Sequence, residues 1–314
     1  MSFSGKVKEE LARLEMKRSC CQLAELAALV RMDGTLQISA NRRMALYVQT
    51  ESAPVARKIY KLAKTRLQTP VEIMARRKLK LRKNITYAVR IHSFDGAVLQ
   101  TLGLLDEQLR IRPGIKPELI RRQCCRRSYL RGVFLGGGSI NNPEGNYHLE
   151  IISNDEDHAA GICNLLNSFH LGAKISPRKS WYVTYLKESE HIADFLTLIG
   201  AHAAVLEFEN VRVLKDVRNQ VNRLVNCETA NLNKTVDAAM RQIENIRLIE
   251  RTIGLDKLDK SLQVVADLRL QHPEISLKEL GEMLVPKVGK SGVNHRIRKI
   301  EEIAAQIHSR MTEG

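Results

Sequence analysis

The sequence predicts an α+β protein, in which a duplicated domain with pseudo-two-fold symmetry is followed by an all-α domain. Two observations predict the duplication: an apolar stretch that ends in glycine occurs twice, and each copy follows a Cys-Cys pair at the same spacing. A third observation, a series of helical patterns after residue 236, predicts the all-α domain. With 314 residues, the chain is long enough for two or three domains.

Composition and charge limit the classes of protein to consider. The chain is 44% hydrophobic and 27% charged, values typical of a globular protein with a sizeable core. Its net charge of +15 favours a polyanionic partner, most often nucleic acid, over a basic protein without one. The N-terminus lacks the apolar run of a signal peptide, and no stretch reaches the ~20 apolar residues of a membrane span. We therefore expect a cytoplasmic protein without a membrane partner, associated with the nucleoid.

The repeated stretch runs from Leu26 to Gly34 and again from Leu130 to Gly138, an offset of 104 residues between positions 26 and 130. Both copies have the pattern of apolar helices built partly from small residues, which let two helix backbones approach closely. We expect the terminal glycine to stop each helix in the left-handed conformation. The two stretches therefore predict a pair of packed helices on a pseudo-two-fold axis.

The segments after each stretch repeat one order of elements. Alternating and helical patterns in the first half predict a hairpin, a helix, a second hairpin and a short closing helix, in residues 36–50, 54–67, 71–92 and 96–105. The second half repeats this order, without its first strand, in residues 147–153, 157–169, 173–184 and 189–198. The duplicated domain is thus expected at 20–208, with repeats over about 20–110 and 124–205, after an N-terminal packing helix in 1–19.

With their downstream strands, the two stretches resemble the motif of the LAGLIDADG homing endonucleases, over roughly residues 20–205. The resemblance implies that the twin helices form the interface between the repeats and that the two sheets make a saddle over DNA. It also implies divalent metal ions, bound by an acid just before the final glycine of each motif. That position is Asp33 in the first copy but Gly137 in the second.

A site with a single carboxylate would bind Mg²⁺ weakly, because this ion needs several oxygen ligands. We therefore expect a LAGLIDADG-like domain without nuclease activity, without a metal ion and without a cofactor. Asp33 would then be a structural residue at a helix end. It would be catalytic only under the alternative, an active Mg²⁺-dependent DNA endonuclease.

The glycine run at 136–138 and the cysteine pairs raise the question of further sites. The run lacks the element order and the Lys-Ser/Thr of a phosphate-binding P-loop, so it predicts close helix packing followed by a turn. Zinc ligands are usually separated, as in C-x₂-C, whereas Cys20 and Cys21 are adjacent, and so are Cys124 and Cys125. We expect these cysteines to be small buried apolar residues.

The composition shifts after the duplicated domain. Residues 209–235 interleave asparagines with basic residues, which predicts a polar helical connector that either contacts DNA or another domain or is a solvated linker. An apolar helical face then begins the C-terminal domain, expected at 236–314. The face consists of Leu232, Val236, Ala239, Ile243 and Ile246.

Patterns near the C-terminus predict a helix-turn-helix at about 275–308. Residues 276–279 (Ser-Leu-Lys-Glu) have the form of a capping box, and Ser291 is expected to cap the second helix. The apolar face of that helix carries Val293, Ile297, Ile300, Ala304 and Ile307. The turn is longer than the tight form of roughly three to four residues, and a plain helical bundle is the alternative.

Polar and basic side chains lie opposite the apolar face of this second helix. Arginine and lysine can donate to guanine edges or phosphates, asparagine can pair with adenine, and a helix N-terminus favours a phosphate. The contacts predicted with double-stranded DNA are Lys278, Lys290, Ser291, Asn294, His295, Arg296, Arg298 and Lys299.

Basic residues of the two expected sheets are candidates for additional phosphate contacts. They are Arg42, Arg43, Arg76, Arg77, Lys78, Lys80, Lys174, Arg178 and Lys179. Ordinary solvated strands and turns explain the same residues equally well. The saddle is also a candidate surface for a protein partner.

One family joins two such domains. Residues 223–231 (RLVNCETAN) and 290–296 (KSGVNHR) resemble the WhiA proteins of Gram-positive bacteria, and the resemblance spans essentially the whole chain. It implies a sequence-specific DNA-binding transcriptional regulator, linked to sporulation in some members and to cell division and chromosome segregation in others. The DNA site, the direction of regulation and the oligomeric state stay open.

Overall fold

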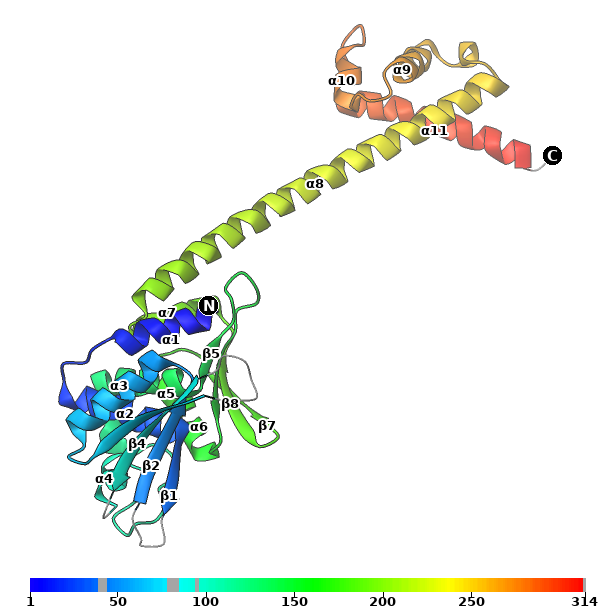
Figure 1. The fold of residues 1–314 in the computed structure, drawn as a ribbon. Coiled ribbons are helices and arrows are strands. Elements are labelled where there is room, and N and C mark those ends of the chain that lie inside the picture. Colours follow the sequence, from blue (N-terminus) through cyan, green and yellow to red (C-terminus); the bar gives the residue numbers. More distant parts are fainter. Residues whose placement is uncertain (39–43, 78–84, 94–95, 313–314) are drawn as a thin grey trace. The chain divides into compact units, whose positions relative to one another are not determined.

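The computed structural model describes residues 1–38, 44–77, 85–93 and 96–312 and divides the chain into two compact units, Met1–Asp216 and Val217–Gly314 (Figure 1). The first unit contains two sheets with their helices and the second is helical, so the predicted fold class is confirmed. The finer ranges expected for domains and connector stay predictions. Among the described residues, no helix combines the length and the apolar character that crossing a membrane requires.

The first repeat follows the predicted order of elements. They are α2 (Ser19–Asp33), β1 (Gly34–Ile38), β2 (Met44–Thr50), α3 (Ala53–Arg66), β3 (Val71–Arg77), β4 (Ile85–Ser93) and α4 (Ala97–Thr101). The strands form an antiparallel sheet in the order β1-β2-β4-β3. The closing helix is shorter than predicted, because the left-handed glycines Gly96 and Gly103 flank it.

The second repeat has the same architecture. Its elements are α5 (Gln123–Gly137), β5 (Gly138–Ile140), β6 (Leu149–Ser153), α6 (Glu156–Asn167), β7 (Lys174–Arg178), β8 (Trp181–Leu186) and α7 (Ser189–Ile199). Its sheet order, β5-β6-β8-β7, is equivalent to that of the first repeat. A short 3₁₀ helix, η1 (Pro117–Ile120), precedes it. The structure therefore shows the duplication that the two similar halves of the sequence predict.

The helices α2 and α5 pack closely along the axis between the repeats, as their small residues predict. A Cβ atom at Gly132 would lie 2.4 Å from the carbonyl oxygen of Glu25, so only glycine permits this approach. The prediction that the final glycines are left-handed was wrong, because Gly34 (φ −81°) and Gly138 (φ −84°) are extended. Each helix continues directly into the first strand of its sheet, so the glycine run at 136–138 is not followed by a turn.

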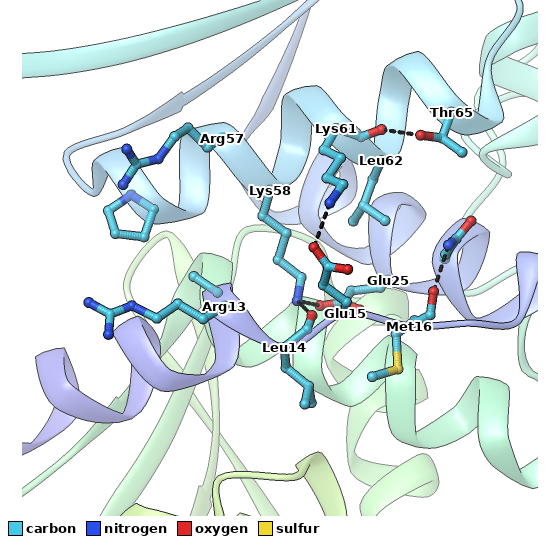
Figure 2. Close-up of a pocket in the computed structure, with 13 residues that line it drawn as sticks. Arg13, Leu14, Glu15, Met16, Glu25, Arg57, Lys58, Lys61, Leu62 and Thr65 are labelled. Carbon is cyan, nitrogen blue, oxygen red and sulfur yellow. Dashed lines mark hydrogen bonds and ion pairs between the residues drawn. The ribbon is translucent and has the colours of Figure 1, made fainter.

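The N-terminal helix α1 (Phe3–Arg13) packs on the duplicated domain through Phe3, Val7 and Leu11, all of them buried. A buried ionic group holds its C-terminal end (Figure 2). Lys58 of α3 donates to the carbonyl oxygens of Leu11 and Leu14, at 2.8 and 2.7 Å. The same amine lies 2.8 Å from Glu25 of α2.

Glu25 also joins the two repeats. Its second carboxylate oxygen lies 3.3 Å from the Arg131 guanidinium of α5, and all three ionic side chains, those of Glu25, Lys58 and Arg131, are buried. Burial lowers the pKa of Lys58, and the charge of Glu25 opposes this effect. A pocket of about 380 Å³ opens beside the group. One buried carboxylate thus balances two cations from different elements.

The second unit is built from the C-terminal part of α8 (His202–Thr252) and from η2 (Leu255–Lys257), α9 (Lys260–Gln271), α10 (Leu277–Glu282) and α11 (Lys290–Thr312). The predicted polar connector lies inside α8, which is a continuous helix. Every side chain in 217–237 is exposed, including Leu232 and Val236. The predicted apolar face is therefore buried only from Ala239 onward.

Candidate nucleic-acid interface

Helices α10 and α11 form a helix-turn-helix within the second unit, joined by residues 283–289. Helix α9 packs against both of them. Their shared core contains Leu280, Leu284, Val293, Ile297 and Ile300, all buried. The apolar face predicted for α11 therefore faces the core.

Local sequence explains how α10 begins and how the turn packs. Ser276 and Glu279 form the predicted capping box, in which each side chain accepts from the other residue's backbone amide. Gly281 lets the turn lie against α10, because a Cβ atom there would be 2.1 Å from the Val288 carbonyl oxygen. The Val288 amide donates to the Gly281 carbonyl oxygen at 3.0 Å.

The start of α11 differs from the prediction that Ser291 caps it. Helix α11 begins at Lys290, so Ser291 lies in the first turn. The amides of Gly292 and Val293 donate to the carbonyl oxygen of Gly289, which therefore precedes the helix as its cap. Ser291 is exposed, and its hydroxyl lies at the N-terminal end of a helix that attracts anions.

The residues predicted to contact DNA lie on two helices, Lys278 on α10 and the others in the N-terminal half of α11. The exposed residues among them are Lys278, Lys290, Ser291, His295, Arg298 and Lys299. Asn294 and Arg296 are half-buried at the edges of the exposed face of α11, as a rotation of about 100° per residue predicts. Within the described part of the chain, no ion pair engages these basic side chains.

The N-terminal half of α11 combines three features that favour a polyanion. Residues 290–299 contain four basic residues and no acidic residue. The helix N-terminus adds the positive end of the helix dipole. Exposed arginine and lysine side chains have the donors that base edges and phosphates accept. This surface, which we call the recognition face, can bind the backbone and the bases of a DNA groove.

The predicted saddle residues are only partly visible in the structure. Arg76 is exposed on β3, Lys174 and Arg178 are exposed on β7, and Lys179 is exposed in the turn that follows. Of Arg77, only the backbone is described. The remaining predicted residues, Arg42, Arg43, Lys78 and Lys80, lie outside the described residues. The exposed cations thus come from both sheets.

The C-terminal ends of α2 and α5, at Asp33 and Gly137, do not offer the pair of acids that would bind metal ions. A Cβ atom at Gly137 would lie 2.7 Å from the carbonyl oxygen of Ile152, so even alanine would force the backbone to move. The opposite helix ends at Asp33, whose pKa is raised by burial to about 6, against the charge of Lys8. The Lys8 amine lies 3.5 Å from the carbonyl oxygen of Gly136. The amine of Lys8 is therefore close enough to Asp33 for their charges to interact.

The sequence did not predict that Lys8 lies near Asp33. The apolar positions of α1 show that this helix packs on the domain, but they do not show where. Burial lowers the pKa of Lys8, and the carboxylate of Asp33 opposes this effect. The contact joins residues that are distant in sequence, so no local pattern reveals it.

One further ion pair joins the repeats near this place, and a buried hydrogen bond lies beside it within the second repeat. Arg31 of α2 lies 3.1 Å from Asp155, which caps α6. Tyr129 of α5 and His158 of α6 lie 2.9 Å apart between the hydroxyl and the imidazole Nε2. Burial and, to a smaller extent, the charge of Arg31 lower the pKa of His158 to about 4, although the charge of Asp155 opposes them. His158 is thus neutral when the protein is folded at pH 7.

We expect His158 to make the first unit less stable as the pH falls from 6.5 towards 4. The unfolded chain binds a proton near pH 6.5, whereas the folded chain binds it near pH 4, so stability is present above this range and lost within it. The full loss is about 3 kcal/mol. Urea unfolding at pH 7 and pH 4.5, followed by fluorescence of the single tryptophan, Trp181, measures it.

The matched variant is His158→Gln. Asp33, with its raised pKa, changes the stability in the opposite direction over the same pH range, so the informative quantity is the difference between parent and variant. The variant should lose less stability on acidification than the parent. An equal loss in both proteins would contradict the assignment to His158.

Comparison with known proteins places both units in one family. Three family models match the chain: the WhiA N-terminal LAGLIDADG-like domain over residues 19–105, the WhiA LAGLIDADG-like domain over 126–218, and the WhiA C-terminal HTH domain over 221–304. Together they cover both repeats and the helix-turn-helix.

Relatives and a solved structure agree with these matches. A probable cell division protein WhiA from Desulfitobacterium hafniense is 67% identical over 98% of this chain and 96% of its own length. A protein of the same name from Bacillus licheniformis is 51% identical over 98% of each chain. The crystal structure of full-length DUF199/WhiA from Thermatoga maritima is 28% identical, with a TM-score of 0.59, over 98% of this chain and 99% of that one. The chain therefore belongs to the WhiA family.

Proposed function

We propose that this protein binds double-stranded DNA at specific sequences through the recognition face of α11 and regulates transcription without cleaving DNA. The observation that carries the proposal is the N-terminal half of α11, where residues 290–299 contain no acidic residue and exposed basic side chains lie opposite the buried apolar face of a helix-turn-helix. A helix placed in this way enters a major groove with its N-terminal residues toward the bases.

The family supports a role in cell division. The relatives from Desulfitobacterium and Bacillus both carry the name of probable cell division proteins. We extend this role to the present chain and include chromosome segregation, and sporulation where the host forms spores. A DNA-binding regulator fits these processes because it sets the expression of many genes from a few DNA sites. In the cell the protein would then be cytoplasmic and associated with the nucleoid.

The end of the motif helices supports binding without cleavage. Phosphodiester hydrolysis by two metal ions needs carboxylates that hold the ions on both sides of the scissile phosphate. Here the second acid is missing at Gly137, and its side chain would collide with the backbone at Ile152. Lys8 brings a positive charge close to Asp33, where a divalent cation would have to bind.

A combined binding and nicking assay tests the proposal. Full-length protein is mixed with genomic fragments and with supercoiled plasmid, in the presence of Mg²⁺ or Mn²⁺. We expect a shift of DNA mobility that weakens steeply with salt, because phosphate contacts release counterions. The plasmid should stay supercoiled. Cleavage that disappears in the Asp33→Ala variant would instead establish the endonuclease alternative, and the absence of any shift at low salt would contradict DNA binding.

A further inference from the structure

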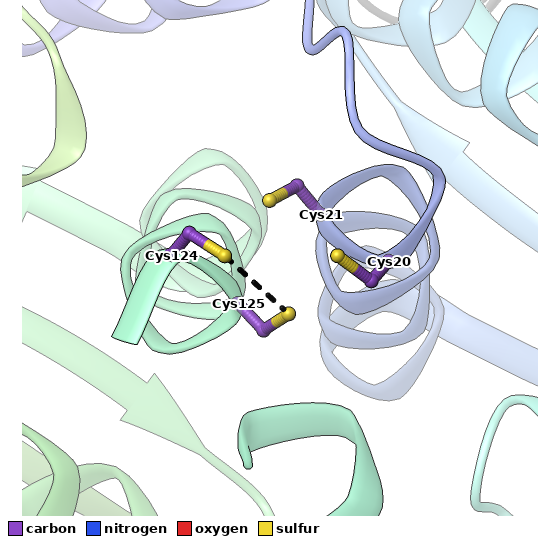
Figure 3. A group of neighbouring side chains, drawn as sticks. All are labelled: Cys20, Cys21, Cys124 and Cys125. Carbon is purple, nitrogen blue, oxygen red and sulfur yellow. Dashed lines mark hydrogen bonds between the residues drawn. The ribbon is translucent and has the colours of Figure 1, made fainter. Parts of the chain in front are cut away.

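The two cysteine pairs, distant in sequence, come together at the N-terminal ends of the twin helices (Figure 3). Cys20 and Cys21 lie in the first turn of α2, and Cys124 and Cys125 in the first turn of α5. The four sulfur atoms all lie within 4.8 Å of one another. All four thiols are free, so no disulfide holds the group together.

This geometry fits a single tetrahedral metal ion. Zinc binds thiolate sulfur at about 2.3 Å, which separates the sulfurs of a tetrahedral site by about 3.8 Å. The sulfurs of Cys124 and Cys125 are 4.0 Å apart, close to that separation. A cluster of several iron and sulfide ions would hold the cysteine sulfurs farther apart, because it places more than one metal ion between them.

The surroundings favour the negative charge that such a site carries. Four thiolates and Zn²⁺ leave a net charge of −2, and two arginines lie beside the sulfurs. Arg18 donates to the Cys124 sulfur at 3.7 Å, and Arg122 donates to the Cys20 sulfur at 3.9 Å. Each arginine thus reaches from its own helix to the opposite cysteine pair.

The arginines repeat with the same offset of 104 residues as the cysteines. Both stand directly before their helix, at a position where a side-chain cap is common, yet neither caps the helix. The two helix N-termini add positive partial charge, which stabilises thiolates. The duplication has therefore produced one site with four ligands and two counter-charges, half from each repeat.

We propose that Cys20, Cys21, Cys124 and Cys125 bind one Zn²⁺ ion, which joins the two repeats at the start of the twin helices. Each thiol that binds releases its proton to solvent, so no oxidant is required. Cys20 and Cys124 are half-exposed and leave an entry path, whereas Cys21 and Cys125 are buried. The adjacent pairs did not suggest this site in the sequence, because the spacing between ligands arises only when the helices pack.

Metal content of the full-length protein tests the proposal. After purification in reducing buffer without chelator, inductively coupled plasma mass spectrometry should find one zinc ion per chain. The Cys20→Ser, Cys124→Ser variant should lose it, whereas the Cys163→Ser, Cys227→Ser control should keep it. Less than a tenth of an equivalent in the parent after incubation with zinc, or equal zinc in the cluster variant, would overturn the proposal.

Cobalt substitution of the unmodified chain keeps the test independent of how the variants fold. Co²⁺ added to metal-free protein should produce the charge-transfer and visible bands of a tetrahedral thiolate site, and Zn²⁺ should abolish them. Arg18→Ala with Arg122→Ala should weaken zinc binding at least tenfold in a chelator competition. Absence of these bands, or a disulfide between the pairs in protein alkylated directly from cells, would contradict a metal site.

Discussion

Replacing Glu25 with alanine is expected to destabilise the first unit by about 3–5 kcal/mol, because two buried cations would lose their common carboxylate. Lys58 lies 2.8 Å and Arg131 3.3 Å from Glu25, and all three side chains are buried. Without the carboxylate, both cations would stay largely buried and without a counter-charge. The tryptophan-monitored urea transition of the full chain measures this change.

Glu15→Ala is the matched control. It also removes a carboxylate that pairs with a lysine of α3, Lys61, but both of these side chains are exposed. An exposed pair contributes less than about 1 kcal/mol, so this variant should unfold almost as the parent does. Equal free energies of unfolding in the two variants would contradict the claim that the buried ion pairs of Glu25 stabilise the first unit.

The second large effect is expected on DNA binding. Arg298→Ala combined with Lys299→Ala removes two exposed cations from the recognition face. Each contact to a guanine edge is worth about 1–3 kcal/mol, so we expect the affinity for a specific site to fall on the order of a hundredfold. Fluorescence anisotropy at fixed salt measures the dissociation constant, and circular dichroism verifies the helical content.

The control for charge is Lys257→Ala with Lys260→Ala, which removes two exposed cations from η2 and α9 of the same unit. If DNA binding depended only on net charge, the two double variants would weaken it equally. An unchanged affinity in the Arg298 and Lys299 variant would exclude α11 as the recognition helix. Loss confined to this variant supports the assignment.

Much of the fold could be predicted because it follows from local patterns. Helical and alternating apolar patterns located most elements of both repeats, and the capping box located the start of α10. Strand β5 was missed because three residues are too few for an alternating pattern. The continuity of α8 was missed because an exposed polar helix has no apolar face that marks its course.

Of the candidate sites, the one formed within a single helix could be predicted from the sequence, whereas those formed by distant segments could not. The exposed face of α11 follows from helical periodicity within one segment, so its residues could be named from the sequence. The approach of Lys8 to Asp33 and the cluster of four cysteines depend on how distant segments pack. The equal spacing of the two cysteine pairs before the repeated motif was the one signal for the cluster, since a two-fold axis brings equivalent positions together.

Genome-wide mapping of bound DNA tests sequence-specific binding through α11 most directly. It requires cells that carry either the parent protein or the Arg298→Ala, Lys299→Ala variant at equal abundance. We predict discrete sites that share a short sequence in the parent and disappear in the variant, with no DNA breaks at those sites. The absence of such sites in the parent, or their persistence in the variant, would contradict recognition by α11.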